Sequence, residues 1–160
     1  MAKYWLLKSE ETCYSIDDLA RDGKTMWDGV RNYQARNYMR DDMKVGDKIL
    51  YYHSNSALTG VVGVAEIARE AYADHTALDP QNDHFDPKST AENPIWMMVD
   101  IGFVSKFPRP VSLQEIKEAV ELSGIVVAQK GSRLSVQPVS EEHFHVMCRL
   151  GGLDGHCPGG

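Results

Sequence analysis

Polar and aromatic residues gather where the expected strands end and turns begin. Lys8-Ser9 closes the first expected strand, residues 27–33 (WDGVRNY) form a turn with two aromatic residues, and His53-Ser54-Asn55 closes a later strand. An indole face can stack on a nucleic-acid base while serine, asparagine and main-chain groups read the base's hydrogen-bonding edge. The same spacing is typical of core aromatics with turn-capping polar residues, and taken by itself it favours that second interpretation.

Other familiar catalytic and ligand-binding motifs are missing from the sequence. It contains no GxGxxG or GxxxxGK[ST] phosphate loop, no GxSxG turn and no HExxH helix. His75 and His84 lie near acidic residues without the tight spacing of a metal site. The three cysteines, Cys13, Cys148 and Cys157, form no CxxC pair, which is typical of reduced thiols. The sequence therefore predicts no metal ion and no cofactor.

The composition is that of one globular domain. The chain has 160 residues, of which 42% are hydrophobic and 25% charged, and this length can bury a large core without disulfides. No apolar run approaches the roughly 18 residues of a membrane span, and the N-terminus turns acidic at once, unlike a signal peptide. We therefore expect a cytoplasmic protein without a membrane partner. The sequence carries no indication of an oligomeric state.

Charge is distributed unevenly along the chain. The formal net charge is −6, which argues against a generic polyanion binder. Residues 66–100 contain eight acidic and two basic side chains, whereas residues 24–48 contain six basic and four acidic ones. One sub-region could therefore face an anion while the molecule as a whole stays acidic. A mixed, solvated surface explains the charges equally well.

Periodicity and capping signals predict an α+β domain. Strands are expected at 3–8, 48–53, 60–69, 95–104 and 132–137, with the last two ended by prolines at 108, 110 and 138. Capping boxes or N-cap residues begin helices at 16–22, 32–41, 112–122 and 140–149. Residues 71–94 form a long excursion, and Gly63 indicates a bulge or a close backbone approach. This order favours a mixed or antiparallel sheet, or a barrel, with helices packed on it.

Five segments of the chain together resemble the EVE domain, a PUA-like family. They are YWLLKSE at 4–10, WDGVRNYQARNYM at 27–39, MKVGDKILYYHSN at 43–55, GVVGVAEI at 60–67 and SRLSVQPVSEE at 132–142. The resemblance covers about residues 3–147 and departs at Glu11, where the family usually has proline. It implies a strongly bent PUA-like β-barrel of mixed or antiparallel strands with flanking helices. We expect a single domain at 1–150 and a flexible glycine-rich tail at 151–160.

The resemblance also implies a function. EVE domains are related to YTH domains, which hold N6-methyladenine in an aromatic cage, and are thought to read modified bases in DNA, chiefly C5-modified cytosine. It implies a non-catalytic nucleic-acid-binding module, for DNA or RNA, that captures a single modified base. The expected base-pocket residues are Trp27, Ser9, Asn32, Tyr33, His53, Ser54 and Asn55. The expected phosphate contacts are Lys8, Arg31, Arg36 and Arg133.

Two alternatives remain at this stage. The related ASCH domains include a hydrolase that removes acyl groups from modified cytidine, and Lys8, Glu10 or Glu66 could serve as nucleophile or base here if burial shifted their pKa values. The other alternative is a small-molecule sensor without a nucleic-acid role, which the acidic composition favours.

Overall fold

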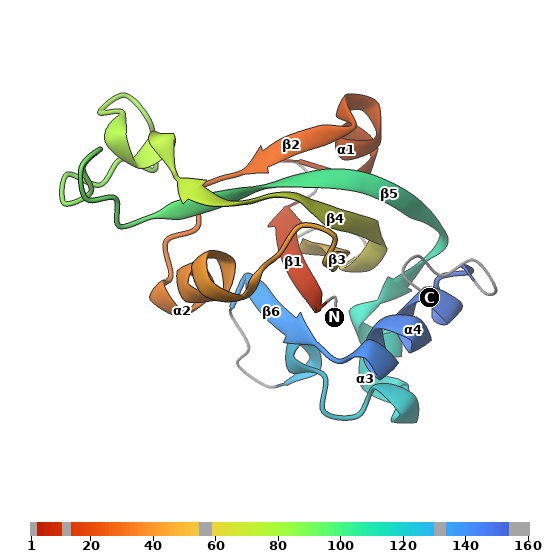
Figure 1. The fold of residues 1–160 in the computed structure, drawn as a ribbon. Helices are drawn as coiled ribbons and strands as arrows, with labels where there is room; N and C mark the ends of the chain where they lie inside the picture. Colours follow the sequence, from red (N-terminus) through yellow and green to blue (C-terminus); the bar gives the residue numbers. More distant parts are fainter. Residues whose placement is uncertain (1–2, 11–13, 55–58, 130–133, 154–160) are drawn as a thin grey trace.

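Six strands form one mixed sheet in the computed structural model, which describes residues 3–10, 14–54, 59–129 and 134–153, without the side chain of Glu10. The hydrogen-bonded order is β2-β5-β4-β3-β1-β6, and among these pairs β1 and β3 run parallel while the other neighbours run antiparallel. Figure 1 shows this arrangement. The strands are β1 (Tyr4–Glu10), β2 (Lys24–Trp27), β3 (Lys48–Ser54), β4 (Gly60–Ala73), β5 (Met97–Ser112) and β6 (Val136–Val139).

Helices connect and cover the strands. The α-helices are α1 (Ile16–Asp22), α2 (Tyr33–Asn37), α3 (Leu113–Glu118) and α4 (Glu141–Leu150), and a π-helix η1 (Tyr38–Asp42) continues α2. Short 3₁₀ turns are η2 (His75–Leu78), η3 (Val120–Leu122) and η4 (Val126–Ala128). The predicted capping boxes at Ser15 and Ser112 are confirmed. Asn32 caps α2, as predicted, by accepting the Ala35 N–H.

Each face of the sheet carries its own core. Alternate residues of β1 divide between them: Tyr4 and Leu6 pack with residues of α3 and α4, whereas Trp5 and Leu7 pack with residues of α1 and α2. β2 lies over the second face, because its last residue, Trp27, packs against the core that contains Trp5 and Leu7. Burial on both faces explains why β1 and β3 are continuous apolar runs.

The bulge or close backbone approach predicted at Gly63 in β4 is confirmed. Pairing with β3 shifts between Tyr51 and Tyr52, opposite Gly63 and Val61, which marks a bulge. A Cβ atom at Gly63 would come within 2.6 Å of the Ser105 carbonyl oxygen and 3.0 Å of the Ile16 side chain. Glycine is therefore required by the close approach of β5 and α1, and not only by local backbone geometry.

Two predictions about prolines are wrong. β5 continues through Pro108 and Pro110 to Ser112, because the register jumps there: Val61 pairs with Val111 but Gly63 pairs with Lys106. Both prolines fall in this irregularity, where the ladder requires no amide donor from them. Similarly, β6 includes Pro138. That strand lies at the sheet edge, where proline is tolerated.

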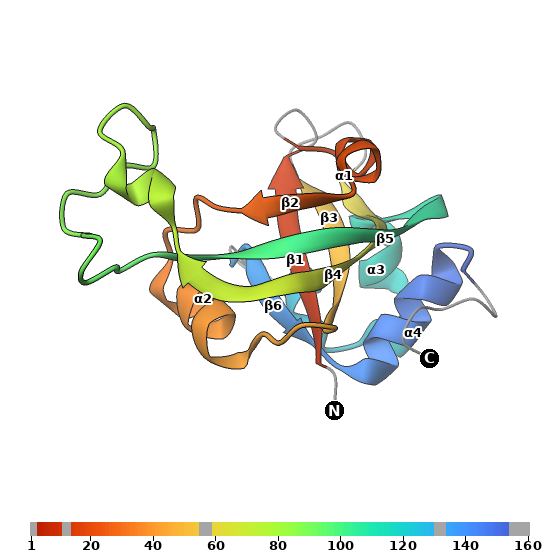
Figure 2. The ribbon, with the colours of Figure 1, turned by 45° about the horizontal axis from the view of Figure 1, so that its top comes forward.

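The α+β class and the mixed sheet with flanking helices are confirmed, but the described strands do not close into a barrel. Their order runs from β2 at one edge to β6 at the other. Both edge strands have only four residues. β2 is itself a strand that sequence patterning did not predict. In the view of Figure 2, β2 crosses β1 near the end of that strand.

The C-terminal end of the described chain stays packed on the domain. Gly151 follows α4, and the Leu153 N–H donates to the Cys148 carbonyl. Leu153 is buried, while residues 154–160 of the predicted tail lie outside the described residues. In the described part of the chain, none of the helices has both the length and the apolar character needed to span a membrane.

Candidate functional site

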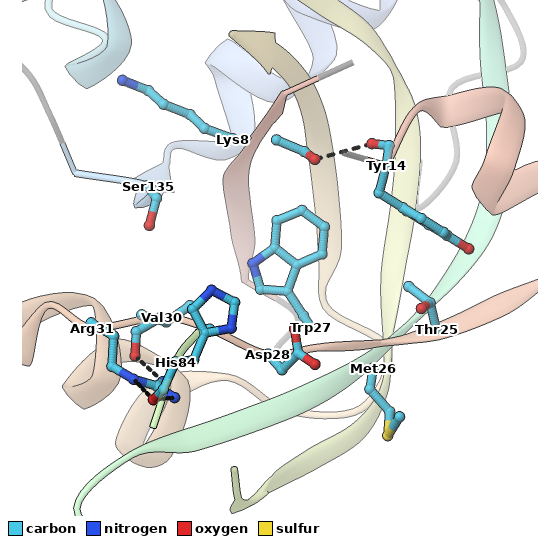
Figure 3. Close-up of a pocket in the computed structure, with 12 residues that line it drawn as sticks. Lys8, Tyr14, Thr25, Met26, Trp27, Asp28, Val30, Arg31, His84 and Ser135 are labelled. Atoms are coloured by element: carbon cyan, nitrogen blue, oxygen red, sulfur yellow. Dashed lines mark hydrogen bonds between the residues drawn. The ribbon is translucent and has the colours of Figure 1, made fainter. Parts of the chain in front are cut away.

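A pocket of about 630 Å³ opens between the end of β1, the edge strand β2 and the turn that follows β2. This volume lies within the range of about 300–1,000 Å³ found for small-molecule sites. Figure 3 shows the pocket with the Trp27 indole at its centre. The lining residues are Lys8, Ser9, Tyr14, Thr25, Met26, Trp27, Asp28, Gly29, Val30, Arg31, His84 and Ser135.

The Trp27 ring is partly buried and held from beneath. Its centroid lies 5.7 Å from that of Tyr51, and the two rings meet edge to face at 82°. The Tyr51 hydroxyl donates to the Tyr14 carbonyl at 2.7 Å, and the Ser9 hydroxyl donates to the same oxygen at 3.0 Å. Burial raises the pKa of the Tyr51 hydroxyl above its ordinary value, so this group remains a neutral donor. The floor of the pocket is therefore fixed before any ligand arrives.

A buried carboxylate anchors the turn after Trp27. Gly29 has a φ of 79°, and its N–H donates to Asp74 Oδ2 at 2.9 Å. The Thr76 N–H and hydroxyl donate to the other oxygen of Asp74. Burial acts to raise the pKa of Asp74, but the hydrogen bonds from Thr76, Gly29 and Arg31 outweigh it and hold the pKa below its ordinary value. Asp74 thus joins the Trp27 turn to the excursion that begins after β4.

Arg31 completes this link. Its guanidinium donates to Asp74, Val30, Thr76 and twice to the carbonyl oxygen of His84, at 2.7–3.2 Å. These five hydrogen bonds match the five N–H donors of an arginine, and the side chain is only 23% exposed. Arg31 therefore holds the pocket together, and in this arrangement it has no N–H left for a phosphate.

The structure brings four of the expected site residues together at the pocket: Lys8, Ser9, Trp27 and Arg31. Burial lowers the pKa of the Lys8 amine, and its Nζ lies 5.6 Å from the centre of the Tyr52 ring. Asn55 and Arg133 lie outside the described residues. Whether the side chains at the pocket bind a base stays a prediction.

Other expected site residues do not line the pocket. Tyr33 is 58% exposed and its ring stacks on Trp96 at 4.9 Å. Arg36 lies over that Tyr33 ring and donates to the Ile95 carbonyl. Asn32 uses its side-chain oxygen as the α2 cap.

The end of β3 is also turned away from the pocket. His53 is 5% exposed and accepts the Ile16 N–H at 3.1 Å. This hydrogen bond therefore connects the start of α1 to β3. Ser54, the last residue of β3, is partly buried and does not line the pocket.

Sequence reasoning missed several residues at and around this site. Thr25 and Met26 were missed because β2 has only four residues and lacks a clear apolar period. His84 and Asp74 belong to the excursion, where no local pattern reveals which residues return to the Trp27 turn. The glycine of the WDG segment was an available signal, because glycine there indicates a constrained turn, and Gly29 does have a positive φ.

The described residues include no group of three or more His, Cys, Asp or Glu side chains placed to hold a metal ion. Cys148 is fully buried. The chemistry that the pocket itself offers is a flat indole, hydroxyl groups on Ser9, Thr25 and Ser135, the carboxylate of Asp28 and the imidazole of His84. Such a set suits a planar, polar-edged guest.

Comparisons with known proteins agree with this fold. The EVE domain family model matches residues 3–150. Human thymocyte nuclear protein 1 is 40% identical over 168 residues, which cover 94% of this chain and 74% of that protein. A structure of a hypothetical protein from Leishmania major aligns with a TM-score of 0.90 and 48% identity, covering 97% of this chain and 98% of the other.

Two further structures are complexes. Human THYN1 protein in complex with DNA containing 5-methylcytosine aligns with a TM-score of 0.86 and 39% identity, over 94% of this chain and 98% of that one. The YTH domain of Zygosaccharomyces rouxii MRB1, in complex with N6-methyladenosine RNA, aligns with a TM-score of 0.53 at 15% identity, over 94% of this chain and 86% of that one, which shows a shared fold only. On the family match and the identity to its relatives, this chain belongs to the EVE domain family.

Proposed function

We propose that this protein binds nucleic acid and holds a single modified base, of the 5-methylcytosine class, against the indole of Trp27. The observation that carries the proposal is the partly exposed Trp27 ring in a pocket of about 630 Å³. A structurally similar human protein, 39% identical, has been crystallised with DNA containing 5-methylcytosine. The pocket is large enough for one base and its sugar, so the base must leave its stack to enter.

The energetics predict modest affinity. Stacking of a base on an aromatic side chain contributes about 1–3 kcal/mol, and extracting a base from a duplex costs a few kcal/mol. A mismatched or single-stranded base avoids much of that cost. Single-stranded substrates should therefore bind more tightly than duplexes with the same modification.

Recognition of a methyl group would come from apolar lining atoms. Val30 lines the pocket beside Trp27, whereas the Met26 side chain points away from the Trp27 ring (Figure 3). One additional methyl group in an apolar site is worth about 1–3 kcal/mol. Preference for 5-methylcytosine over cytosine should accordingly be on the order of tenfold, and not absolute.

The charge distribution supports an oriented approach of the nucleic acid. The excursion that supplies one wall is acidic, whereas Lys8 stands on the opposite side at the end of β1. A phosphate backbone would be repelled from the first and attracted to the second. We propose that the backbone passes the β1 end of the pocket.

Binding to a panel of short oligonucleotides tests the proposal. Trp27→Ala should weaken binding to a single-stranded oligonucleotide with one 5-methylcytosine by about tenfold, and Trp27→Phe by less, because a smaller ring keeps part of the stacking. Tyr33→Ala is the matched control, since it removes an aromatic ring that lies outside the pocket. Thermal melting of each variant identifies any loss of fold.

Equal binding by the parent and by Trp27→Ala would overturn the proposal. Absence of binding to every oligonucleotide at low salt would overturn it as well and would favour a small-molecule sensor, because electrostatic attraction to phosphates is strongest under those conditions.

A hydrolase is a second candidate, and one observation favours it. The pKa of the Lys8 amine at the pocket is lowered by burial, which increases the share of the neutral, nucleophilic form. Against it, Glu66 is engaged with Lys48 at 2.8 Å and does not line the pocket. Incubation with acylated and alkylated cytidines followed by mass spectrometry decides the matter: unchanged masses would exclude this activity for the tested nucleosides.

A further inference from the structure

We propose that His84 is the second stacking surface of the pocket and contacts the same base as Trp27. This inference rests on the proposed function, because it assigns a contact within the same site. Tyr33 and His53, the other ring-bearing residues expected in the base pocket, do not line the pocket. His84 does line it, from a segment 57 residues further along the chain than Trp27.

The His84 ring lies flat on the turn that follows Trp27. A Cβ atom placed on Gly29 would lie 2.7 Å from His84 Cε1, 2.9 Å from Nε2 and 3.0 Å from Nδ1. Three nearly equal distances mean that the Gly29 backbone meets the face of the imidazole and not its edge. Any side chain at position 29 would occupy the place of the ring. The imidazole is therefore supported on one face by the backbone of the turn, which leaves the other face for a guest.

The backbone of His84 is held as firmly as its ring. Its carbonyl oxygen accepts two hydrogen bonds from Arg31, at 2.7 and 3.1 Å, and its N–H donates to Asn82 Oδ1 at 2.8 Å. Arg31 is in turn paired with the buried carboxylate of Asp74. This chain of contacts fixes His84 relative to the Trp27 turn, although His84 belongs to the excursion. A stacking surface of this kind is ordered in advance and loses little freedom on binding.

The remaining aromatic groups near the pocket are engaged elsewhere. Tyr14 lines it but directs its hydroxyl to Asp22 of α1 at 2.6 Å, and Figure 3 shows its ring pointing away from the centre. Trp96 is 5% exposed, and its indole N–H donates to Asp86. In the described part of the chain, the Trp27 ring contacts the Tyr51 ring and makes no ring contact with His84.

The experiment compares two histidines of the same excursion. His84→Ala removes the proposed surface, and His84→Phe keeps a flat ring without the imidazole nitrogens. His75→Ala is the matched control, because His75 is exposed, belongs to η2 and does not line the pocket. Fluorescence anisotropy of a labelled single-stranded oligonucleotide with one 5-methylcytosine measures the dissociation constant of each full-length variant. Binding by Trp27→Ala is measured beside them.

We expect His84→Ala to weaken binding about five- to tenfold, at the lower end of what base stacking contributes. His84→Phe and His75→Ala should bind within about twofold of the parent. The slope of affinity against salt concentration should be the same for the parent and for His84→Ala, because a stacking contact releases no counterions.

Three results would overturn the inference or its basis. If Trp27→Ala loses affinity while His84→Ala binds like His75→Ala, His84 does not contact the base, and the proposed function survives. If His84→Phe is as weak as His84→Ala, the imidazole does not act by stacking. If Trp27→Ala binds like the parent, the proposed function itself falls. Because the His84 side chain is exposed, His84→Ala should melt like the parent, and loss of fold will not obscure these outcomes.

Discussion

The rings of Trp27 and Tyr51 meet edge to face with their centroids 5.7 Å apart, although their strands are not neighbours in the sheet. β5 and β4 stand between β2 and β3 in the hydrogen-bonded order. The contact therefore exists because the sheet bends until its β2 edge passes over the middle strands. The pocket is a product of this curvature, since its lining comes from both the edge strand and the end of β1.

Tyr51 should support the base-binding position of Trp27 through its ring. Tyr51→Leu removes an aromatic pair worth about 0.5–1.5 kcal/mol beyond burial, so Trp27 loses its fixed orientation and affinity for a modified oligonucleotide should fall. Tyr51→Phe keeps the ring and loses only the bond to the Tyr14 carbonyl, which Ser9 still contacts. Tyr51→Phe serves as the control, and it should bind like the parent and lose about 1 kcal/mol of unfolding free energy in urea. Equal affinities for both variants would contradict this role.

Gly29→Ala should cost more in binding than its backbone strain explains. Gly29 and Gly23 have φ values of 79° and 80°, so alanine is strained to a similar degree at both, by about 1–2 kcal/mol. A Cβ atom at Gly23 meets nothing within 4 Å, whereas one at Gly29 collides with the His84 ring. Both variants should lose comparable stability, and only Gly29→Ala should also lose oligonucleotide affinity. Melting curves and anisotropy titrations of the two variants provide the check.

Arg31→Lys should destabilise the protein although the charge is kept. Lysine can pair with Asp74 but cannot also reach the His84 carbonyl and Thr76 with a planar fork. The expected loss is about 1–3 kcal/mol of unfolding free energy, measured by urea denaturation. Arg40→Lys is the matched control, because Arg40 is exposed and pairs with its neighbour Asp41, and its midpoint should not move. Identical midpoints for all three proteins would show that the Arg31 contacts add nothing.

Acidification should release the link between the Trp27 turn and the excursion. The pKa of Asp74 is below its ordinary value in the folded state, so its ionised form stabilises the fold above the unfolded pKa of about 3.9. This stability is lost as the pH falls from about 4 through the lowered folded pKa. The Asp74→Asn variant has no carboxylate at this position whose stabilising effect could be lost. The difference in unfolding free energy between the parent and this variant should therefore shrink over this pH range. A gap that stays constant down to about pH 2 would contradict the assignment.

Lys8 should contribute to salt dependence if it meets a phosphate. Lys8→Met keeps an unbranched apolar stem at the pocket and removes the charge. The slope of the logarithm of affinity against the logarithm of salt concentration should decrease by about 1. Lys24→Met removes one charge from an exposed residue that does not line the pocket, and its slope should match the parent's. A parental slope for Lys8→Met would place the phosphate path elsewhere.

Local sequence signals predicted the elements that local physics controls. Ser15 with Asp18 and Ser112 with Glu115 form capping boxes, and each helix begins where its box predicts. The apolar runs of β1, β3 and β4 became central strands because burial on both faces requires such runs. The prolines of β5 and β6 were misread because their tolerance depends on register and edge position, which neighbouring strands decide.

The candidate site was predictable only in part. Trp27, Lys8, Ser9 and Arg31 were expected and do line the pocket, because they lie at strand ends and turns that the chain order brings to one side of the sheet. Asn32 and His53 were assigned to the base, yet each uses its side chain to fix a helix start. Arg31 was assigned to a phosphate, but its donors are used within the protein. A polar residue in a turn satisfies local backbone groups and ligands by the same chemistry, so its type cannot separate the two roles.

The sequence by itself determined every strand except β2, the helix starts and the presence of an indole in a constrained turn, since these follow from periodicity, capping and glycine conformation within a few residues. Only the tertiary structure decided what surrounds that indole. The bend of the sheet brings Tyr51 beneath Trp27, and the Arg31–Asp74 pair brings His84 onto Gly29. These contacts join residues 24 to 55 positions apart. Their formation depends on strand curvature and on a buried ion pair, which no local pattern encodes.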